Sequence, residues 1–360
     1  MNSLMKLRTL ILRCGKVAKM ATKVELRKIT PSELDKYVLE NHHEANFLQT
    51  SSLGKTYEDD GKQVFYFGVF SDNKLCGSAV AILKPAKRGR YLEIPGGPIL
   101  DWDGKKSILR SFMSEIKDFA HEQNCVFVRM RPNIADTDKH RELAKNLGLV
   151  LSPMHLHAEH TVMLDLTKSE DELMAEMRRQ TRYEVRRATK LGIKVEYSTS
   201  KKAFNDFYDL QLETAKRQGF IPSERKLILA QHDIFGDKAR IYTASLDGKK
   251  LAQGLILMQK PEAIYHEAAS TLDGRKYPGA YALQWQIMKD AKAMGINRYN
   301  LFGIAPPNSP HHRYAGVTTF KTGFGGEQVA YLPAHDLVIK PLHYKLVHIL
   351  EEARKKRRHL

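Results

Sequence analysis

Apolar residues recur in the same order in the two halves of the chain. Residues 67–85 and 241–261 each contain two apolar runs separated by a polar turn, Asp72-Asn73 in the first and Asp247-Gly248 in the second. Apolar runs around a short turn with Asn or Gly are typical of β-hairpins. Both segments end with a Lys-Pro pair. We therefore predict one hairpin in each half.

A helix and a strand are predicted after each hairpin. Residues 105–122 and 280–294 carry apolar residues three or four positions apart, which is the spacing of a helix with one buried face. Short apolar runs at 125–130 and 299–302 are predicted to be strands. The repeated order of hairpin, helix and strand predicts two copies of one α/β unit, each a mixed sheet flanked by helices.

A strongly basic helix is predicted between the two units, over residues 170–190. Ser169 followed by Glu172 is a capping-box pattern for its start. Four apolar residues can pack inward: Leu173, Met177, Val185 and Ala188. Arg178, Arg182 and Arg186 are predicted to line one exposed stripe, with Arg179, Arg187 and Lys190 beside it. Because arginine offers planar, paired donors to phosphate, contact with a polyanion is favoured over a merely solvated face.

Composition and charge narrow the classes of protein. The length of 360 residues predicts two domains, and a hydrophobic content of 42% excludes a disordered chain. A mean hydropathy of −0.44 argues against an integral membrane protein. The three cysteines are too few and too scattered for a disulfide framework or a zinc cluster, which indicates a reducing, cytoplasmic compartment.

The charge favours a polyanionic partner. Lys and Arg number 58 against 41 Asp and Glu, a formal net charge of +17, which suits nucleic acid, phosphorylated metabolites or anionic lipid. Residues 1–23 form a basic leader that we interpret as unstructured, in preference to a membrane-surface helix or a mitochondrial-type presequence. The basic run at 354–358 is weaker evidence, because terminal charge runs are often solvated.

Several ordered motifs resemble the FemABX family of bacterial peptidoglycan-bridge aminoacyltransferases. They are TRYEVRRATKLGIKV (181–195), YALQWQIMKDAKAMGINRYNLFGI (281–304), FKTGFGGEQVAYLPAHDLVIKPLHYKL (320–346), NFLQTSSLGK (46–55) and GGPILD (96–101). The resemblance covers about residues 24–346. It implies an α/β fold of two tandem acetyltransferase-like (GNAT) domains, in agreement with the internal duplication.

The resemblance also implies domain boundaries, an activity and partners. Domain 1 would comprise 24–160 plus 335–360, because the family returns the C-terminal segment to it, and domain 2 would comprise 161–334. The implied reaction moves an amino acid from aminoacyl-tRNA to an amine of the stem peptide of a peptidoglycan precursor, UDP-MurNAc-pentapeptide or lipid II. We expect a monomeric cytoplasmic enzyme without a cofactor. Peripheral contact with the inner face of the plasma membrane is a further expectation.

Aminolysis of an ester requires a neutral amine and a stabilised oxyanion. Lys321 matches the family lysine at the reacting ester and is the first candidate for the oxyanion role; the alternative is a strand-edge lysine between two turns. Phe320 matches the aromatic residue beside it. Asp101 is a third catalytic candidate, as a partner for the acceptor ammonium or a base, although capping a turn is the favoured role. No metal is expected, since His311-His312 lack matching ligands.

Further candidates would bind the acceptor. Lys55 and Arg225 match the family's basic pair for the precursor pyrophosphate, and Arg217 is an alternative to Arg225. Ser223 matches a hydroxyl residue near this arginine, whereas Leu229 replaces a family tyrosine.

Two more acceptor candidates come from one predicted strand. Tyr265 matches a tyrosine of the peptide channel, with an aromatic on a buried strand as the equal alternative. Glu267 replaces a second tyrosine and would place a carboxylate near the stem peptide.

Two other functions compete with this interpretation. An acyl-CoA-dependent acetyltransferase would use an R-x-x-G-x-A loop whose backbone N–H groups bind pyrophosphate. The segment 275–280 has that pattern except that Pro278, which has no N–H, replaces the first glycine. A non-catalytic RNA- or envelope-binding protein is the second alternative, and the basic helix suits it equally well.

Overall fold

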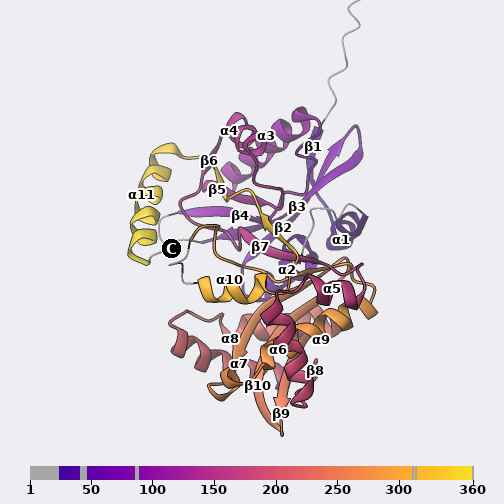
Figure 1. Cartoon of the computed structure of the whole chain (residues 1–360). Helices are drawn as coiled ribbons and strands as arrows, with labels where there is room; N and C mark the ends of the chain where they lie inside the picture. The colour runs from indigo at the N-terminus through magenta and orange to yellow at the C-terminus, as the bar shows by residue number, and fades with distance from the viewer. Residues whose placement is uncertain (1–23, 41–46, 86–88, 310–311, 313, 359–360) are drawn as a thin grey trace, which may run out of the picture.

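The computed structural model describes residues 24–40, 47–85, 89–309, 312 and 314–358. Its elements form two units, one above the other in Figure 1, each built around a mixed sheet. The leader at 1–23 and His311 lie outside the described residues. No helix in the described ranges has the length and apolarity needed to cross a membrane.

The upper unit contains a seven-stranded sheet in the order β1-β2-β3-β4-β5-β14-β6. Its strands are β1 (Val24–Lys28), β2 (Gln63–Ser71), β3 (Lys74–Lys84), β4 (Arg90–Gly96), β5 (Cys125–Pro132), β6 (Leu149–Leu151) and β14 (His335–Val338). The helical elements of this part are α1 (Pro31–Glu40), η1 (Phe47–Gln49), α2 (Ser51–Asp59), α3 (Lys106–Glu122), α4 (Asp138–Asn146) and α11 (Pro341–Arg358). Strand β14 comes from near the C-terminus and pairs with both β5 and β6.

The lower unit contains a second seven-stranded sheet, ordered β13-β7-β12-β11-β10-β9-β8. Its strands are β7 (His160–Asp165), β8 (Lys194–Ser198), β9 (Ala239–Leu246), β10 (Lys249–Gln259), β11 (Glu262–Ser270), β12 (Arg298–Asn300) and β13 (Glu327–Ala330). The helical elements are α5 (Glu170–Glu176), α6 (Arg179–Lys190), α7 (Lys201–Gln218), α8 (Arg225–Phe235), η2 (Gly236–Lys238), η3 (Asp273–Lys276), α9 (Gly279–Ala293) and α10 (Ala315–Thr322).

The predicted duplication is confirmed by the strand pairing. Both hairpins, β2–β3 and β9–β10, are antiparallel, and their turn residues all have positive φ, as a type I′ turn requires. In each unit a third antiparallel strand then leads through a helix to a parallel neighbour: β4 through α3 to β5, and β11 through α9 to β12. The domain boundaries at 160/161 and 334/335 themselves stay a prediction.

Two predicted elements are wrong in extent. The helix over 170–190 is broken at Met177, whose ψ of 144° is extended, because the Arg178 N–H donates to the Gly323 carbonyl (2.8 Å) instead of continuing the helical ladder. The predicted capping box at Ser169 and Glu172 and the burial of the four inward residues are confirmed. The predicted strand 299–302 ends at Asn300, since Phe302 adopts a left-handed φ of 57°.

A shared hydrophobic core joins the two units. Phe47, Leu48 and Leu53, from η1 and α2, pack with residues of α7, α8 and the second sheet. The joint also contains an ion pair between Lys226 of α8 and Asp60, the residue that ends α2. Separate cores lie against the first sheet and between the second sheet and α6 and α9. The segment that begins the first unit's α2 is therefore part of the second unit's packing.

Candidate active site

Lys321 lies near the end of α10 and is almost fully buried, with 7% of its surface exposed. The alternative of a strand-edge lysine is therefore wrong. Its Nζ donates to the carbonyl oxygens of Phe302 (3.1 Å) and Gly303 (2.7 Å) and lies 5.8 Å from the centre of the Tyr265 ring. Burial lowers the pKa of Lys321 to about 7, because the charged form loses its hydration.

The backbone after β12 makes this arrangement. Phe302 turns into the left-handed region, with a φ of 57°, and its carbonyl and the next one face the lysine. Two of the three Nζ donors of a protonated lysine are thus occupied. One donor is left for another acceptor at the same point.

Phe320 points into an aromatic cluster beside the lysine. Its ring lies 5.1 Å from that of Tyr281 and 5.2 Å from that of Phe324, both at edge-to-face angles.

Burial raises the pKa of Tyr265 to about 12, so this phenol stays protonated at neutral pH. Tyr265 is both a buried strand residue of the second core and a neighbour of Lys321, so its two alternative interpretations are compatible.

A β-bulge in β11 places His266 and Glu267, which are consecutive in sequence, on the same face of the second sheet. In the β10–β11 pairing, Leu255 faces Glu267 and Ile256 faces Tyr265, which leaves His266 without an opposite residue. His266 packs edge-on against Phe47 (5.3 Å between ring centres) and lies 5.9 Å from Phe302. His266 therefore connects the neighbourhood of Lys321 to the joint between the units.

Glu267 lies next to this histidine and accepts hydrogen bonds from neutral groups. Ser223 Oγ donates to it (2.7 Å), as does Gln211 Nε2, and His266 Nδ1 is 3.7 Å away. Burial lowers the pKa of His266, which keeps the imidazole neutral. The Glu267 carboxylate is only 13% exposed, yet it forms no ion pair with a lysine or arginine in the described ranges. It is a mostly buried carboxylate held by two neutral donors.

The two predicted pyrophosphate-binding cations lie on neighbouring helices, each in an ion pair of its own. Lys55 is exposed on α2 and pairs with Asp59 (2.8 Å). Arg225, at the start of α8, is exposed, pairs with Asp209 and lies over the Tyr208 ring. Helices α2 and α8, which carry these two cations, pack against each other.

Arg217 and Asp101 occupy other positions. Arg217 is half-buried and donates to the Ser270 carbonyl (2.6 Å) at the end of β11. Asp101 lies in an exposed turn, where its carboxylate accepts the Asp103 N–H (3.1 Å), which is the turn-capping role. No contact among the described residues joins Asp101 to Lys321.

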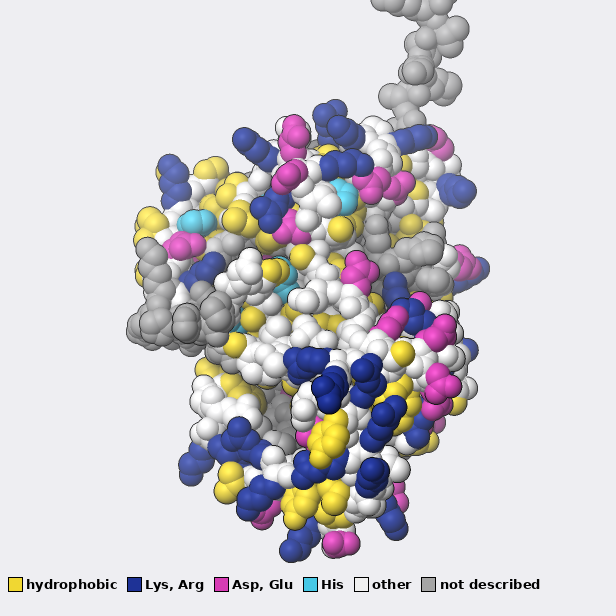
Figure 2. Space-filling view, viewed as in Figure 1, with side chains coloured by type: hydrophobic (Ala, Val, Ile, Leu, Met, Phe, Trp, Pro, Cys, Tyr) yellow, Lys and Arg dark blue, Asp and Glu magenta, His cyan; other side chains and the backbone are white. Residues whose placement is uncertain are grey.

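The basic surface around α6 contains fewer free cations than the sequence predicted. In Figure 2, dark blue side chains gather where Figure 1 shows α6, with hydrophobic side chains among them. Four of the six cations are exposed: Arg178, Arg179, Arg186 and Lys190. Arg182 instead bends back to donate to the carbonyls of Ala175 (2.6 Å) and Met177 (2.9 Å), and Arg187 pairs with Glu184 (3.1 Å). Arg182 therefore caps the end of α5 and is not part of a free stripe.

Arg178 links the basic surface to the helix of Lys321. Its Nη2 donates to the Thr319 carbonyl (3.1 Å) of α10, and its backbone N–H to Gly323 just after that helix. The first residues of α6 are thus fixed next to the segment that carries the buried lysine.

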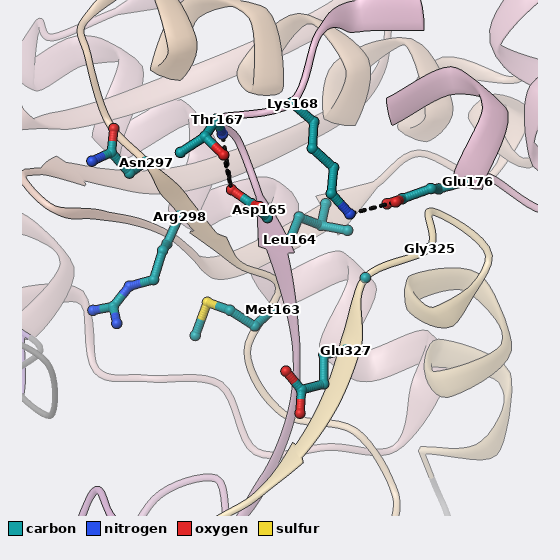
Figure 3. Close-up of a pocket in the computed structure, with 11 residues that line it drawn as sticks. Met163, Leu164, Asp165, Thr167, Lys168, Glu176, Asn297, Arg298, Gly325 and Glu327 are labelled. Carbon is teal, nitrogen blue, oxygen red and sulfur yellow. Dashed lines mark hydrogen bonds and ion pairs between the residues drawn. The ribbon is translucent and has the colours of Figure 1, made fainter. Parts of the chain in front are cut away.

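A separate open hollow of about 890 Å³ lies along β7, β12 and β13. Figure 3 shows Lys168 paired with Glu176 and Asp165 accepting from Thr167, so these lining charges are already satisfied. None of the predicted site residues lines it. The described residues also contain no group of three or more His, Cys, Asp or Glu side chains arranged to hold a metal.

Sequence reasoning missed His266, Gln211 and Phe302. His266 lies between the two predicted residues Tyr265 and Glu267, and this position in the sequence could have indicated that it belongs to the site. Strict alternation along a strand would turn it to the opposite face from both neighbours. Only the bulge brings it beside Glu267.

Comparisons with known proteins agree with the fold. The sequence model of the FemAB family matches residues 29–253 and 246–352. Aminoacyltransferase FemB of Staphylococcus epidermidis is 22% identical, over 84% of this chain and 92% of FemB. The crystal structure of FemX covers 90% of this chain and 100% of its own, with a TM-score of 0.81 and 18% identity. A tandem GNAT protein from the clavulanic acid biosynthesis pathway gives a TM-score of 0.57 at 12% identity, covering 88% of this chain and 100% of its own. The predicted architecture of two tandem GNAT-like units is confirmed.

Proposed function

This chain belongs to the FemAB family, and on that basis we propose that it transfers an amino acid from aminoacyl-tRNA to an amine on the stem peptide of a peptidoglycan precursor. The name aminoacyltransferase of its relative FemB supports the reaction class. The buried Lys321 carries most weight, because a buried ammonium with two of its three donors occupied has one donor left for a developing oxyanion.

The reaction would use the third donor of Lys321. The acceptor amine attacks the ester carbonyl carbon, and the carbonyl oxygen becomes an alkoxide that Lys321 Nζ stabilises by a charge-assisted hydrogen bond. Collapse of this intermediate breaks the bond to the ribose oxygen and forms the amide. The proton lost by the amine passes to the ribose oxygen, which restores its hydroxyl group. The carbonyls of Phe302 and Gly303 hold the ammonium in place throughout.

Glu267 would bind the acceptor amine before reaction. Its half-buried carboxylate is held by Ser223 and Gln211 and has no lysine or arginine partner in the described structure, so an incoming ammonium would complete it. That ammonium then gives one proton to solvent water, and the neutral amine that remains is the nucleophile. Lys55 and Arg225, on the adjoining helices α2 and α8, would hold the pyrophosphate of the precursor, with Arg217 as the alternative cation.

The exposed cations of α6 would bind the tRNA. Arg178, Arg179, Arg186 and Lys190 present their charges to solvent, and Arg178 is fixed to α10. Phosphates held on this surface would lie beside the segment that contains Lys321. Positive side chains that release counterions from phosphates bind RNA without reading its sequence.

An acyl-CoA donor is less well supported. Pro278 is the N-cap residue of α9, at the place where such enzymes need backbone N–H groups for pyrophosphate. Proline supplies none, and the loop therefore lacks one donor of that cradle.

The test compares three possible donors, each incubated separately with the full chain. The protein is incubated with a UDP-linked precursor and one of three donors: charged total tRNA, uncharged tRNA with free amino acids, or acetyl-CoA. Mass spectrometry of the precursor then identifies what was added. Lys321→Met is the impaired variant, and Lys202→Met, at an exposed lysine on α7, is the matched control.

The expected product gains one amino-acid residue, only with charged tRNA, and Lys321→Met forms it about 10²–10³ times more slowly. Acetylation of the precursor would contradict the proposal in favour of a CoA enzyme. Binding of charged tRNA and precursor without any product, by wild type and variants alike, would favour the non-catalytic alternative.

A further inference from the structure

Helix α11 is fixed to the first sheet through one face only. Tyr344 is buried there, with its ring 5.5 Å from that of Phe127 and its hydroxyl donating to Asp336 (2.9 Å). Two turns further along that face, Glu351 accepts a hydrogen bond from Arg129 (2.7 Å). These buried contacts hold the helix in a single orientation.

The opposite face of α11 is apolar and uncovered. Leu342 is 82% exposed, Leu346 62% and Ile349 63%. At 100° per residue, positions separated by four and then three lie in one stripe, and this stripe is turned away from Tyr344 and Glu351. Figure 1 shows α11 along the outer edge of the upper unit. A single exposed leucine is ordinary on a protein surface, whereas an ordered row of large apolar side chains marks an interaction site.

Positive charges flank this stripe. Lys345 and Arg354 are both exposed and lie on opposite sides of the stripe, and Lys355 follows. Glu352 lies on the Lys345 side, so these cations outnumber the acid beside them. The acidic Glu351 is directed inward to Arg129. An apolar stripe bordered by cations is the pattern of a helix that lies in the interface of an anionic bilayer, with its apolar side chains at the boundary between headgroups and acyl chains.

We propose that the stripe of Leu342, Leu346 and Ile349 docks on an anionic lipid surface. A second copy of the chain is a poorer occupant, because two stripes in contact would bring the cations beside each of them, among them Lys345 and Arg354, close together. Anionic headgroups complement the same charges. Docking would also bring the enzyme to a lipid-linked acceptor; that consequence rests on the proposed function, while lipid binding itself does not.

The test is co-sedimentation of the full chain with vesicles, either of phosphatidylcholine alone or of an equal mixture with phosphatidylglycerol. Leu346→Gln/Ile349→Gln removes the centre of the stripe. Leu39→Gln/Leu272→Gln, at side chains 53% and 67% exposed elsewhere, is the matched control. Circular dichroism verifies folding, and transfer to a soluble UDP-linked precursor is measured in parallel.

Wild type and the control are expected to bind the anionic vesicles. The affinity of the stripe variant for these vesicles is expected to be lower by about tenfold or more. All three are expected to act equally on the soluble precursor. Equal vesicle binding by stripe variant and wild type would overturn the inference, as would failure of wild type to bind. Loss of a dimer in light scattering, without a change in vesicle binding, would assign the stripe to self-association. If wild type binds vesicles but transfers nothing, the proposed function fails and the membrane surface stands.

Discussion

Replacing Lys321 by methionine is expected to slow transfer and, near neutral pH, to stabilise the fold. Methionine has a similar length and no charge. Removing the proposed oxyanion donor should lower kcat by about 10²–10³. The effect on stability has the opposite sign because burial of an unpaired lysine opposes folding.

The magnitude follows from the change in pKa. A fall from 10.5 to about 7 corresponds to about 5 kcal/mol of free energy of unfolding once the lysine is protonated in both states. Methionine removes this penalty but leaves two carbonyls, those of Phe302 and Gly303, without their donor. At about 1–2 kcal/mol for each lost hydrogen bond, the variant should be about 2 kcal/mol more stable at pH 6.5.

The sign depends on pH. Above 10.5 the lysine is neutral in both states and carries no penalty. As pH falls towards 7 the unfolded chain binds a proton that the folded chain does not, so wild-type stability decreases, and below pH 7 the penalty is constant. The difference in free energy of unfolding between variant and wild type should therefore shrink by about 3 kcal/mol from pH 6.5 to 9.5.

Urea unfolding at several pH values, with kcat measured on the same samples, tests this reasoning. Lys202→Met, at an exposed side chain, should show a difference from wild type that does not vary with pH. A variant of Lys321 that loses activity and stability together, with no dependence on pH, would refute the claim that this lysine is a buried, uncompensated cation.

Three other changes should separate recognition from folding. Glu267→Gln keeps the shape and removes the charge, so the KM for the acceptor should rise while that for aminoacyl-tRNA stays constant; an unchanged acceptor KM would exclude the amine-binding role. Arg186→Gln should weaken tRNA binding and flatten the slope of log Kd against log salt by about one, whereas an unaltered slope would remove Arg186 from the RNA site. Asp336→Asn leaves the buried Arg129 without its main carboxylate and should lower the free energy of unfolding by about 3–5 kcal/mol; a loss below about 1 kcal/mol would show that Glu351 alone neutralises the arginine.

Local sequence signals predicted the repeated framework. Turn residues such as Asp247-Gly248 adopt positive φ at little cost, and the helix over 280–294 has regularly spaced apolar residues, so each element is specified by its own segment. The return of the C-terminal segment carried no such signal and was expected only from the family resemblance. Strand β14 lies between β5 and β6 because of partners about 200 residues earlier in the chain.

The site depended on contacts that sequence spacing does not encode. The helix break at Met177 arises from a carbonyl at Gly323, and the position of His266 from a bulge opposite Leu255. The burial of Lys321 likewise requires Phe302 to turn its carbonyl inward. The residue types at the site could be chosen from motifs, whereas their mutual arrangement arises from tertiary structure.

The core shared by Phe47, Leu48 and Leu53 with α7 and α8 has a consequence for how the chain comes apart. A fragment ending near residue 160 would leave these three apolar side chains facing water, and the complementary fragment would expose the surface that they cover. Neither half should be soluble when expressed alone, whereas the two halves produced together should associate and remain soluble. Denaturation of the intact chain should accordingly follow a single cooperative transition.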